Sequence, residues 1–179
     1  MNYFDELRCA MVLLAADSRT VFLGQSVLFD SNAMYRTLQH EDGTDIVPRD
    51  RRIEFPVAED MQLGVSIGLA LAGMIPISLF PRWDFLLLAT NQLVGHLDKI
   101  PLYSEFRPKV IVRTAVGSSY PFSSGIQQSG DYTAAFRSML KSVNVFELNS
   151  KFDVLPAYKA ALASDRSSLL VERMDLYNP

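Results

Sequence analysis

Cysteine and histidine are scarce in this sequence, and their scarcity limits the chemistry available to the chain. The 179 residues include one cysteine, Cys9, which cannot form a disulfide within the chain. The two histidines, His40 and His96, lie far apart in the sequence and show no metal-binding spacing, so we expect no metal site. The single cysteine, and the lack of a basic leader followed by an apolar segment, favour a cytoplasmic location over secretion.

An excess of charge of one sign is also missing. Charged residues make up 21% of the chain and the net charge is −3, so we expect no nucleic acid partner and no attraction to anionic membranes. One long uncharged run, 63–80, is interrupted by glycines and by Pro76. We interpret it as a helix, a turn and a buried strand rather than a membrane span. The hydrophobic content of 49% is typical of a globular protein, and the length predicts a single domain, 1–179.

Several common catalytic motifs are missing too. The sequence contains no P-loop, no G-x-G-x-x-G and no C-x-x-C. The arginines Arg49, Arg51 and Arg52 form a basic cluster, but acidic residues alternate with them. We therefore expect a solvated loop with surface ion pairs at this position.

Short apolar segments alternate with helical patterns along the whole chain. We expect strands at 21–24, 52–55, 76–80, 109–113, 144–148 and 168–172, helices at 5–17, 31–38, 59–72, 82–98, 132–140 and 151–163, and a loop at 116–130. This alternation is typical of βαβ units and predicts an α/β protein: a three-layer αβα fold with a mostly parallel sheet. Such sheets bind ligands beyond the carboxyl ends of their strands, where the strand order reverses.

A pair of acidic residues, Glu59 and Asp60, opens the most apolar of these helices. Acids in a first turn can simply stabilise the helix through its dipole. Alternatively, Glu59 faces a crevice lined by Phe80, Trp83 and Phe85, where a buried carboxyl group can hydrogen-bond a ring nitrogen of a heterocycle. The same aromatic residues also fit simple packing in the core. Both interpretations stay open on the residues alone.

A series of short motifs accompanies Glu59. They are PVAE at 56–59, a glycine-rich helix from 64, GMIPI at 73–77, DF at 84–85 and NQ at 91–92. This segment, 54–99, resembles the pyrimidine-binding domain of the transketolase family, in the form found in the beta subunit of the first component of 2-oxo acid dehydrogenases. The segment FLGQSV at 22–27 and the strands at 110–113 and 169–172 extend the resemblance over nearly the whole chain.

The resemblance implies a fold and a cofactor. The fold is the thiamine diphosphate-binding fold of the pyrimidine-binding type. Glu59 is then the catalytic residue that hydrogen-bonds the aminopyrimidine ring of thiamine diphosphate, Phe85 stacks on that ring, and Phe80 and Trp83 are neighbours. The cofactor's thiazolium is the electron sink for cleaving a carbon–carbon bond next to a carbonyl group.

The sequence also departs from the family. The family's His-Ser-Gln segment falls on 128–130, so Gln128 replaces the histidine and Gln128 with Ser129 forms the substrate-side loop. Gln25 stands where many relatives have an acid. The Gly-Asp-Gly and Asn-Asn motifs of the pyrophosphate-binding domain do not occur, and the chain stops about where the family's carboxyl-terminal domain begins.

From the resemblance we expect the pyrimidine-binding subunit of a split thiamine diphosphate enzyme. An alpha-type partner would supply the pyrophosphate-binding domain and Mg²⁺, in a heterotetramer or around a homodimer of this chain. Large apolar interfaces fit the run 63–80 and the leucines at 86–88. Both 2-oxo acid decarboxylation with acyl transfer and two-carbon ketol transfer stay open. The alternative is a non-catalytic interaction or regulatory module that retains the fold, which Gln128 favours and Glu59 disfavours.

Overall fold

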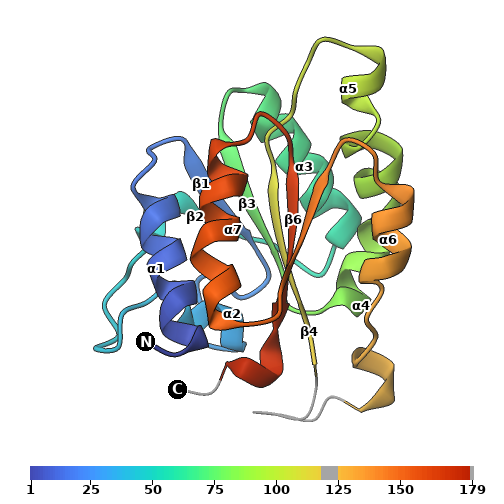
Figure 1. Ribbon diagram of the computed structural model, residues 1–179. Coiled ribbons are helices and arrows are strands. Elements are labelled where there is room, and N and C mark those ends of the chain that lie inside the picture. The colour runs from blue at the N-terminus through green and yellow to red at the C-terminus, as the bar shows by residue number, and fades with distance from the viewer. Residues whose placement is uncertain (118–124, 178–179) are drawn as a thin grey trace.

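The central sheet of the computed structural model, which describes residues 1–117 and 125–177, contains six parallel strands (Figure 1). The strands are β1 (Thr20–Gly24), β2 (Arg52–Glu54), β3 (Ile75–Phe80), β4 (Ile111–Val116), β5 (Asn144–Leu148) and β6 (Ser168–Arg173). They lie in the order β2-β1-β3-β4-β6-β5, and every neighbouring pair is parallel. The predicted α/β class and the predicted strands are confirmed.

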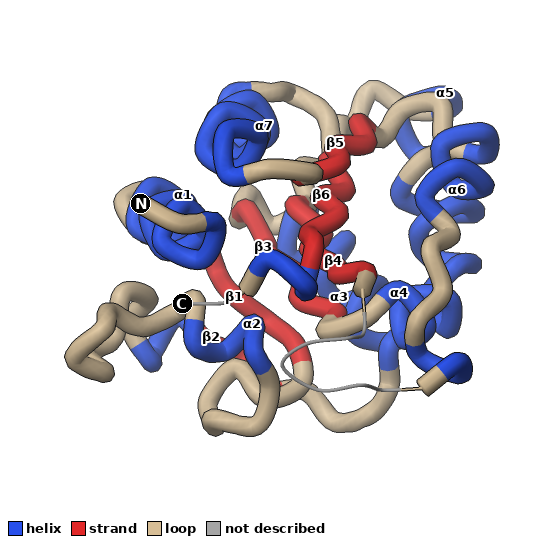
Figure 2. Tube along the Cα trace, turned by 60° about the horizontal axis from the view of Figure 1, so that its bottom comes forward, coloured by secondary structure: helices blue, strands red, loops and turns tan. Residues whose placement is uncertain are grey.

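Helices cover both faces of the sheet. They are α1 (Tyr3–Ala15), α2 (Ala33–Arg36), α3 (Glu59–Leu71), α4 (Trp83–Leu86), α5 (Ile100–Tyr103), α6 (Thr133–Met139) and α7 (Lys151–Ala163). Figures 1 and 2 show α1 and α7 side by side on one face, while α3, α4 and α6 lie on the other. Short 3-10 turns occupy Arg49–Arg51, Leu87–Ala89, Ile126–Gln128 and Met174–Leu176.

The two helical layers give the protein two apolar clusters, one on each face. Successive residues of a strand point to opposite faces, so Ile111 packs with the α1 and α7 side while Val112 packs with the α3 and α6 side. All six residues of β3 are buried. Such continuous burial is typical of a central parallel strand covered on both faces.

The predicted helix at 82–98 is wrong as a single regular helix. The chain passes from α4 through a 3-10 turn into a π-helical segment, Asn91–Leu97. The hydroxyl of Thr90 donates to the carbonyl oxygen of Leu87 at 2.5 Å, and such a bond from a side chain competes with the regular helical ladder. The predicted helix at 31–38 shortens to α2 in the same way, because Thr37 donates to the carbonyl of Met34.

The expected solvated arginine loop is correct for Arg49, which is exposed, but wrong for Arg51 and Arg52. The Arg52 side chain is buried, where it donates to the carbonyl oxygen of Val47 and forms an ion pair with Asp45 at 2.7 Å. Arg51 donates to the carbonyl oxygen of Ala15 at 2.5 Å, at the carboxyl end of α1. The connection before β2 and the end of α1 leave carbonyl groups without helical or strand partners, and these guanidinium groups satisfy them.

The uncharged run 63–80 forms α3, a turn and β3, as expected. Gly73 has φ 86° at this turn, a left-handed conformation that glycine adopts without steric cost. No helix in the described ranges has both the length and the apolar character needed to cross a bilayer. Of the predicted loop at 116–130, residues 118–124 lie outside the described part of the chain.

Candidate functional site

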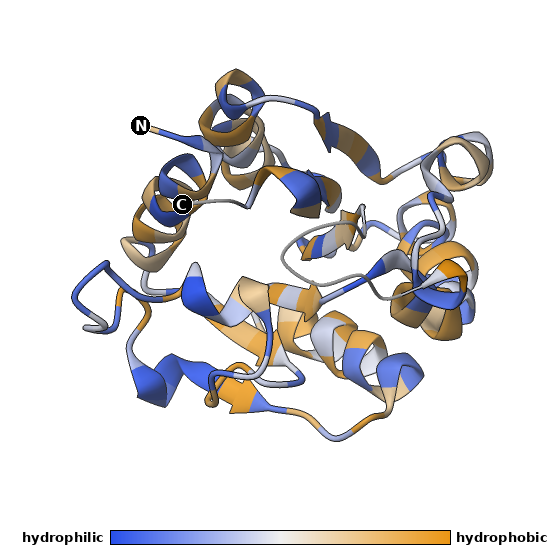
Figure 3. Cartoon of the chain, turned by 90° about the horizontal axis from the view of Figure 1, so that it is seen from below, coloured by the Kyte–Doolittle hydropathy of each residue, from blue (hydrophilic) through white to orange (hydrophobic). Residues whose placement is uncertain are grey.

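The order of the strands determines where this sheet can bind a ligand. From β1 the chain moves to β2 on one side, while from β3 it moves to β4 on the other, so the loops after β1 and β3 diverge. Figure 3 views this carboxyl edge from below. A cavity of about 510 Å³ lies between the two loops. Its lining residues are Gln25, Ser26, Asp30, Ser31, Asn32, Ala33, Arg36, Pro81, Arg82, Phe85 and Met174. The cavity therefore lies at the predicted reversal of strand order.

The loop after β1 leaves the sheet through a tight contact. A Cβ atom at Gly24 would lie 2.6 Å from the carbonyl oxygen of Leu79, so only glycine fits between β1 and β3 at this level. Gln25 follows directly, and Ser26 has φ 59°, which is uncommon for a residue other than glycine. The end of β1 thus turns sharply and brings Gln25 to the cavity wall.

Glu59 is the first residue of α3, and its side chain is turned into the protein. It is 4% exposed, and its Oε1 accepts a hydrogen bond of 3.0 Å from Nε2 of Gln25. The adjacent Asp60 is exposed and accepts from Nε2 of Gln92 at 3.2 Å. The two acids therefore separate: Glu59 adjoins the cavity through Gln25, while Asp60 lies at the surface. Both lie in the first turn of α3, where the helix dipole favours negative charge.

The three predicted aromatic residues have different surroundings. Phe85 lines the cavity. Phe80 and Trp83 are buried in the apolar cluster beneath it, where Nε1 of Trp83 donates to the hydroxyl of Thr133 at 3.1 Å. The Trp83 and Phe136 rings lie 4.7 Å apart. The roles of all three residues toward a cofactor stay predictions, and among them only Phe85 contacts the cavity.

The predicted substrate-side loop is linked to the cavity by an arginine that the sequence did not reveal. Nη1 of the buried Arg82 donates to the carbonyl oxygens of Gly117 at 3.0 Å and Gln128 at 3.4 Å. Ser129 bonds locally to the carbonyl of Ile126. Arg82 lies two residues beyond the end of β3, and a cation at this position of the sheet would have indicated a site residue. The sequence alone did not indicate this, because the strand order has to be known first.

Burial lowers the pKa of the Arg82 guanidinium below its ordinary value, and the carboxylates of Asp84 and Asp175 oppose this change. The group stays charged near neutral pH, because the ordinary pKa of arginine is so high. At the rim, Arg36 forms an ion pair with Asp30 at 3.2 Å, and both side chains are more than half exposed. The cavity therefore combines an aromatic wall with charged groups of both signs.

Comparisons with known proteins identify relatives of this chain in sequence and in fold. No family model matches the chain. The 2-oxoisovalerate dehydrogenase subunit beta of Bacillus subtilis (strain 168) is 28% identical, over 99% of this chain and 53% of that protein. The pyruvate dehydrogenase E1 component subunit beta of Cyanidium caldarium is 23% identical, over 99% of this chain and 54% of that protein. The chain thus spans about half the length of these curated relatives.

A solved structure described as a split gene transketolase, inactive beta4 tetramer, superposes with a TM-score of 0.72. It covers 97% of this chain and 52% of that one at 16% identity, which is a likeness of fold. The chain is a transketolase-like domain of the pyrimidine-binding type. The two curated relatives are described as subunits of dehydrogenases.

One further pattern in this transketolase-like domain has a structural explanation. Residues Gly64 to Gly68 read G-x-S-x-G, the pattern of a nucleophile elbow, which needs its serine exposed on a strand-to-helix turn. Here Ser66 lies buried in the middle of α3, and its hydroxyl donates to the carbonyl oxygen of Gln62 at 2.9 Å. Ser66 is therefore a packing residue of the helix.

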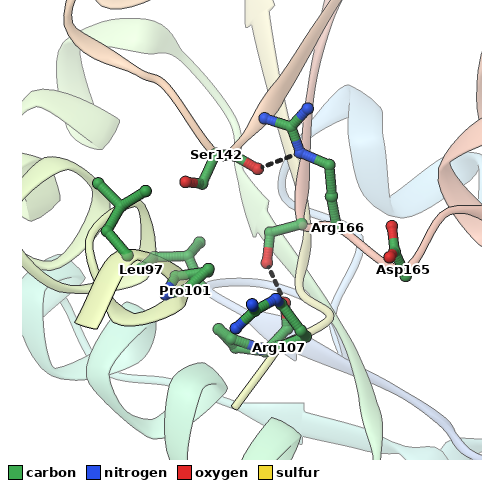
Figure 4. Close-up of a pocket in the computed structure, with 9 residues that line it drawn as sticks. Leu97, Pro101, Arg107, Ser142, Asp165 and Arg166 are labelled. Carbon is green, nitrogen blue, oxygen red and sulfur yellow. Dashed lines mark hydrogen bonds between the residues drawn. The ribbon is translucent and has the colours of Figure 1, made fainter. Parts of the chain in front are cut away.

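A second cavity of the domain, about 260 Å³ in volume, lies at the opposite edge of the sheet (Figure 4). Arg166 donates there to the carbonyl oxygens of Ser142 at 2.7 Å and Lys141 at 2.6 Å, and Arg107 donates to that of Ser104. These guanidinium groups hold the backbone of neighbouring loops. Within 1–117 and 125–177, no group of three or more His, Cys, Asp or Glu side chains is placed to hold a metal ion.

Proposed function

We propose that this chain is the pyrimidine-binding, beta-type subunit of a two-chain thiamine diphosphate enzyme. The enzyme cleaves a carbon–carbon bond next to a carbonyl group and transfers the resulting acyl or two-carbon unit. The observation that carries the proposal is the buried carboxylate of Glu59, held by Gln25 beside the cavity at the reversal of strand order. The likeness to dehydrogenase beta subunits and to a split transketolase supports it.

The residues of this site fit the pyrimidine end of the cofactor. Gln25 donates to Oε1 of Glu59. No described residue donates to Oε2, so this second oxygen is available to a ring nitrogen. Phe85 presents an aromatic ring to a cavity whose volume is in the usual range for small ligands, about 300–1,000 Å³. When bound, thiamine diphosphate supplies an electron sink for the bond cleavage. Glu59 would hold and exchange the proton at the ring nitrogen, as a general acid and base.

The diphosphate end would be bound by an alpha-type partner chain, together with Mg²⁺. Exposed apolar side chains on α3, just before it, and in the 3-10 turn that contacts it support such a partner. Val57 is 79% exposed, Met61 on α3 is 50% exposed, and Leu88 is 63% exposed. Exposed apolar groups gathered beside a site are typical of protein interfaces. We propose that this surface, formed by Val57, Met61 and Leu88, is covered in the assembled enzyme.

A non-catalytic module that has kept the fold is the second candidate. Gln128 favours it, because an amide cannot replace the acid–base chemistry of the imidazole at the matching position of the family. A module of this kind would bind the partner chain without cofactor chemistry.

The decisive experiment uses the complex of this chain with the partner that co-purifies with it. In Glu59→Gln we expect proton exchange at the cofactor's thiazolium carbon to slow by about 10²–10⁴-fold, the usual contribution of a general acid and base. Asp60→Asn, which makes the same change at the exposed neighbouring acid, should exchange like the wild type. Wild-type rates in Glu59→Gln would refute the assignment, and no exchange in the wild-type complex would favour the module.

A further inference from the structure

Glu54, at the end of β2, binds the loop after β1 through three main-chain hydrogen bonds. Its carboxylate accepts from the amides of Ser26 at 2.5 Å, Val27 at 2.9 Å and Leu28 at 2.9 Å. Three consecutive amides converging on one carboxylate form a strong, charge-assisted contact. The side chain is half-buried and lines neither of the two cavities described above. Glu54, on the edge strand β2, therefore holds the loop after β1 in place.

The loop adopts an uncommon conformation at the point where Glu54 binds it. Ser26 has φ 59°, a left-handed value that residues with a Cβ atom rarely adopt. Such a conformation persists when surrounding contacts over-determine it, and the hydrogen bonds to Glu54 are contacts of this kind. On the other side of Gln25, Gly24 is fixed by its close approach to Leu79. Gln25 is thus held between two constrained residues.

This constraint determines how Gln25 meets Glu59. Its Nε2 donates to Oε1 of Glu59 at 3.0 Å, which fixes the plane of the carboxylate and leaves the second oxygen for a ligand. We infer that Glu54 is a positioning residue for Glu59, acting through the loop 24–28 and the amide of Gln25. The inference rests on the proposed function for the meaning of Glu59, but the positioning itself can be measured without cofactor.

The chemistry of the two side chains suits these roles. A carboxylate has two oxygens and enough lone pairs for three amide donors, whereas the amide of a glutamine offers one oxygen. At position 25 the requirement is reversed. The amide of Gln25 donates to Glu59 without any proton to lose, whereas an acid 3 Å away could donate only while it is protonated, and an ionised one would repel Glu59.

The first experiment uses NMR on the full chain without cofactor. In Glu54→Gln we expect the amide protons of Ser26, Val27 and Leu28 to exchange with solvent at least tenfold faster, and the side-chain amide of Gln25 to lose its distinct signals. Glu41→Gln makes the same change at an exposed carboxyl group, and it should leave these signals in place. Unchanged signals in Glu54→Gln would overturn the inference, whatever the protein's function.

The second experiment measures kcat and KM in the complex with the partner chain. We expect Glu54→Gln and Gln25→Leu each to lower kcat about tenfold with little change in KM, since both loosen the Glu59 carboxylate. The double variant should be no slower than either single one, because the two residues act through one contact. Glu54→Asp, which keeps both oxygens, should restore part of kcat. Additive losses would overturn the inference, and loss of signals by NMR with full activity in Glu59→Gln would refute only the proposed function.

Discussion

At the scale of single residues, neighbours in the sequence have very different surroundings. Glu59 and Asp60 are both acids in the first turn of α3, yet one is buried against Gln25 and the other is exposed. The glycines differ as sharply. Gly24 has no room for a side chain, whereas nothing lies within 4 Å of a Cβ atom built on Gly68. Such contrasts depend on the packing of other elements and decide what each substitution does.

The contrast between the two glycines gives a prediction for stability. Gly24→Ala places a methyl group 2.6 Å from the carbonyl oxygen of Leu79, and overpacking of this kind costs about 1–3 kcal/mol. Gly68→Ala, in the exposed interior of α3, should instead stabilise the protein by about 0.5–1 kcal/mol. Urea unfolding of both variants measures the difference. Equal changes in the free energy of unfolding of the two variants would contradict the close approach of β1 to β3 at Gly24.

At the scale of elements, single carboxylates anchor whole connections. Asp98 is buried, and its Oδ1 accepts from the amides of Lys141 at 2.7 Å, Ser142 at 2.6 Å and Val143 at 3.2 Å, in the connection between α6 and β5. Burial raises the pKa of Asp98, but these hydrogen bonds and the contact with Lys99 outweigh it, so its pKa lies below the ordinary value. The ionised carboxylate therefore stabilises the folded state.

This gives a prediction for the acid range. Because the folded-state pKa of Asp98 is lowered, its contribution is present above the ordinary value, near pH 4, and is lost as the pH falls through the folded-state pKa. Asp98→Asn should lower the free energy of unfolding by about 1.5–3 kcal/mol at neutral pH. The difference from the wild type should shrink below pH 4 in chemical denaturation. A difference independent of pH would contradict this account.

The elements that the sequence predicted best carry their own local signals. The helix at 151–163 and the strand at 144–148 were predicted with the observed bounds, and Ser150 with Asp153 forms a capping box at the start of that helix. The prediction of one helix at 82–98 was wrong, because the hydrogen bond of Thr90 and the π-helical turn interrupt a segment whose apolar pattern is that of a single helix. Glu59 was singled out by its place after a strand. Arg82 and Glu54 could not be identified from the sequence, because their contacts depend on the order of strands in the sheet.

At the scale of the whole molecule, a buried polar cluster joins the first helix to the last strand. Arg113 on β4 and Glu172 on β6 form a fully buried ion pair at 2.7 Å. The hydroxyls of Tyr158 on α7 and Tyr177 both donate to Glu172. Tyr3 on α1 donates to the carbonyl oxygen of Leu148 and accepts from the amide of Arg173. Burial first, and the charge of Glu172 as well, raise the pKa of all three tyrosines.

The tyrosine cluster predicts steep alkaline unfolding. Above pH about 10 the unfolded chain loses these protons while the folded protein keeps them, so the free energy of unfolding falls as the pH rises. Each tyrosine contributes about 1.4 kcal/mol per pH unit. Tyr158→Phe should flatten this fall, whereas Tyr103→Phe, at an exposed site, should not. Circular dichroism and tyrosinate absorbance test this, and ionisation of every tyrosine before unfolding would contradict it.

The proposed partner surface predicts how the chain assembles. Met61→Lys puts a charge on the proposed partner surface, and it should abolish co-purification of the partner while leaving the unfolding midpoint of the chain unchanged. Met139→Lys is the control, because Met139 is an exposed methionine on α6.

The isolated chain should bind thiamine diphosphate weakly or not at all in calorimetry. Tight, magnesium-dependent binding by this chain alone would mean that it carries a diphosphate site of its own.

The place of β6 in the sheet has a consequence for biosynthesis. Ser168–Arg173 follows β1 to β5 in the sequence, yet it lies between β4 and β5 in the sheet. During synthesis, β4 and β5 therefore have unpaired hydrogen-bonding edges until β6 is made. Arg113 likewise lacks its buried counter-ion, Glu172, until then. Open edges invite aggregation. The nascent protein can therefore complete its sheet only when this strand has left the exit tunnel, and until then the facing edges of β4 and β5 stay unpaired.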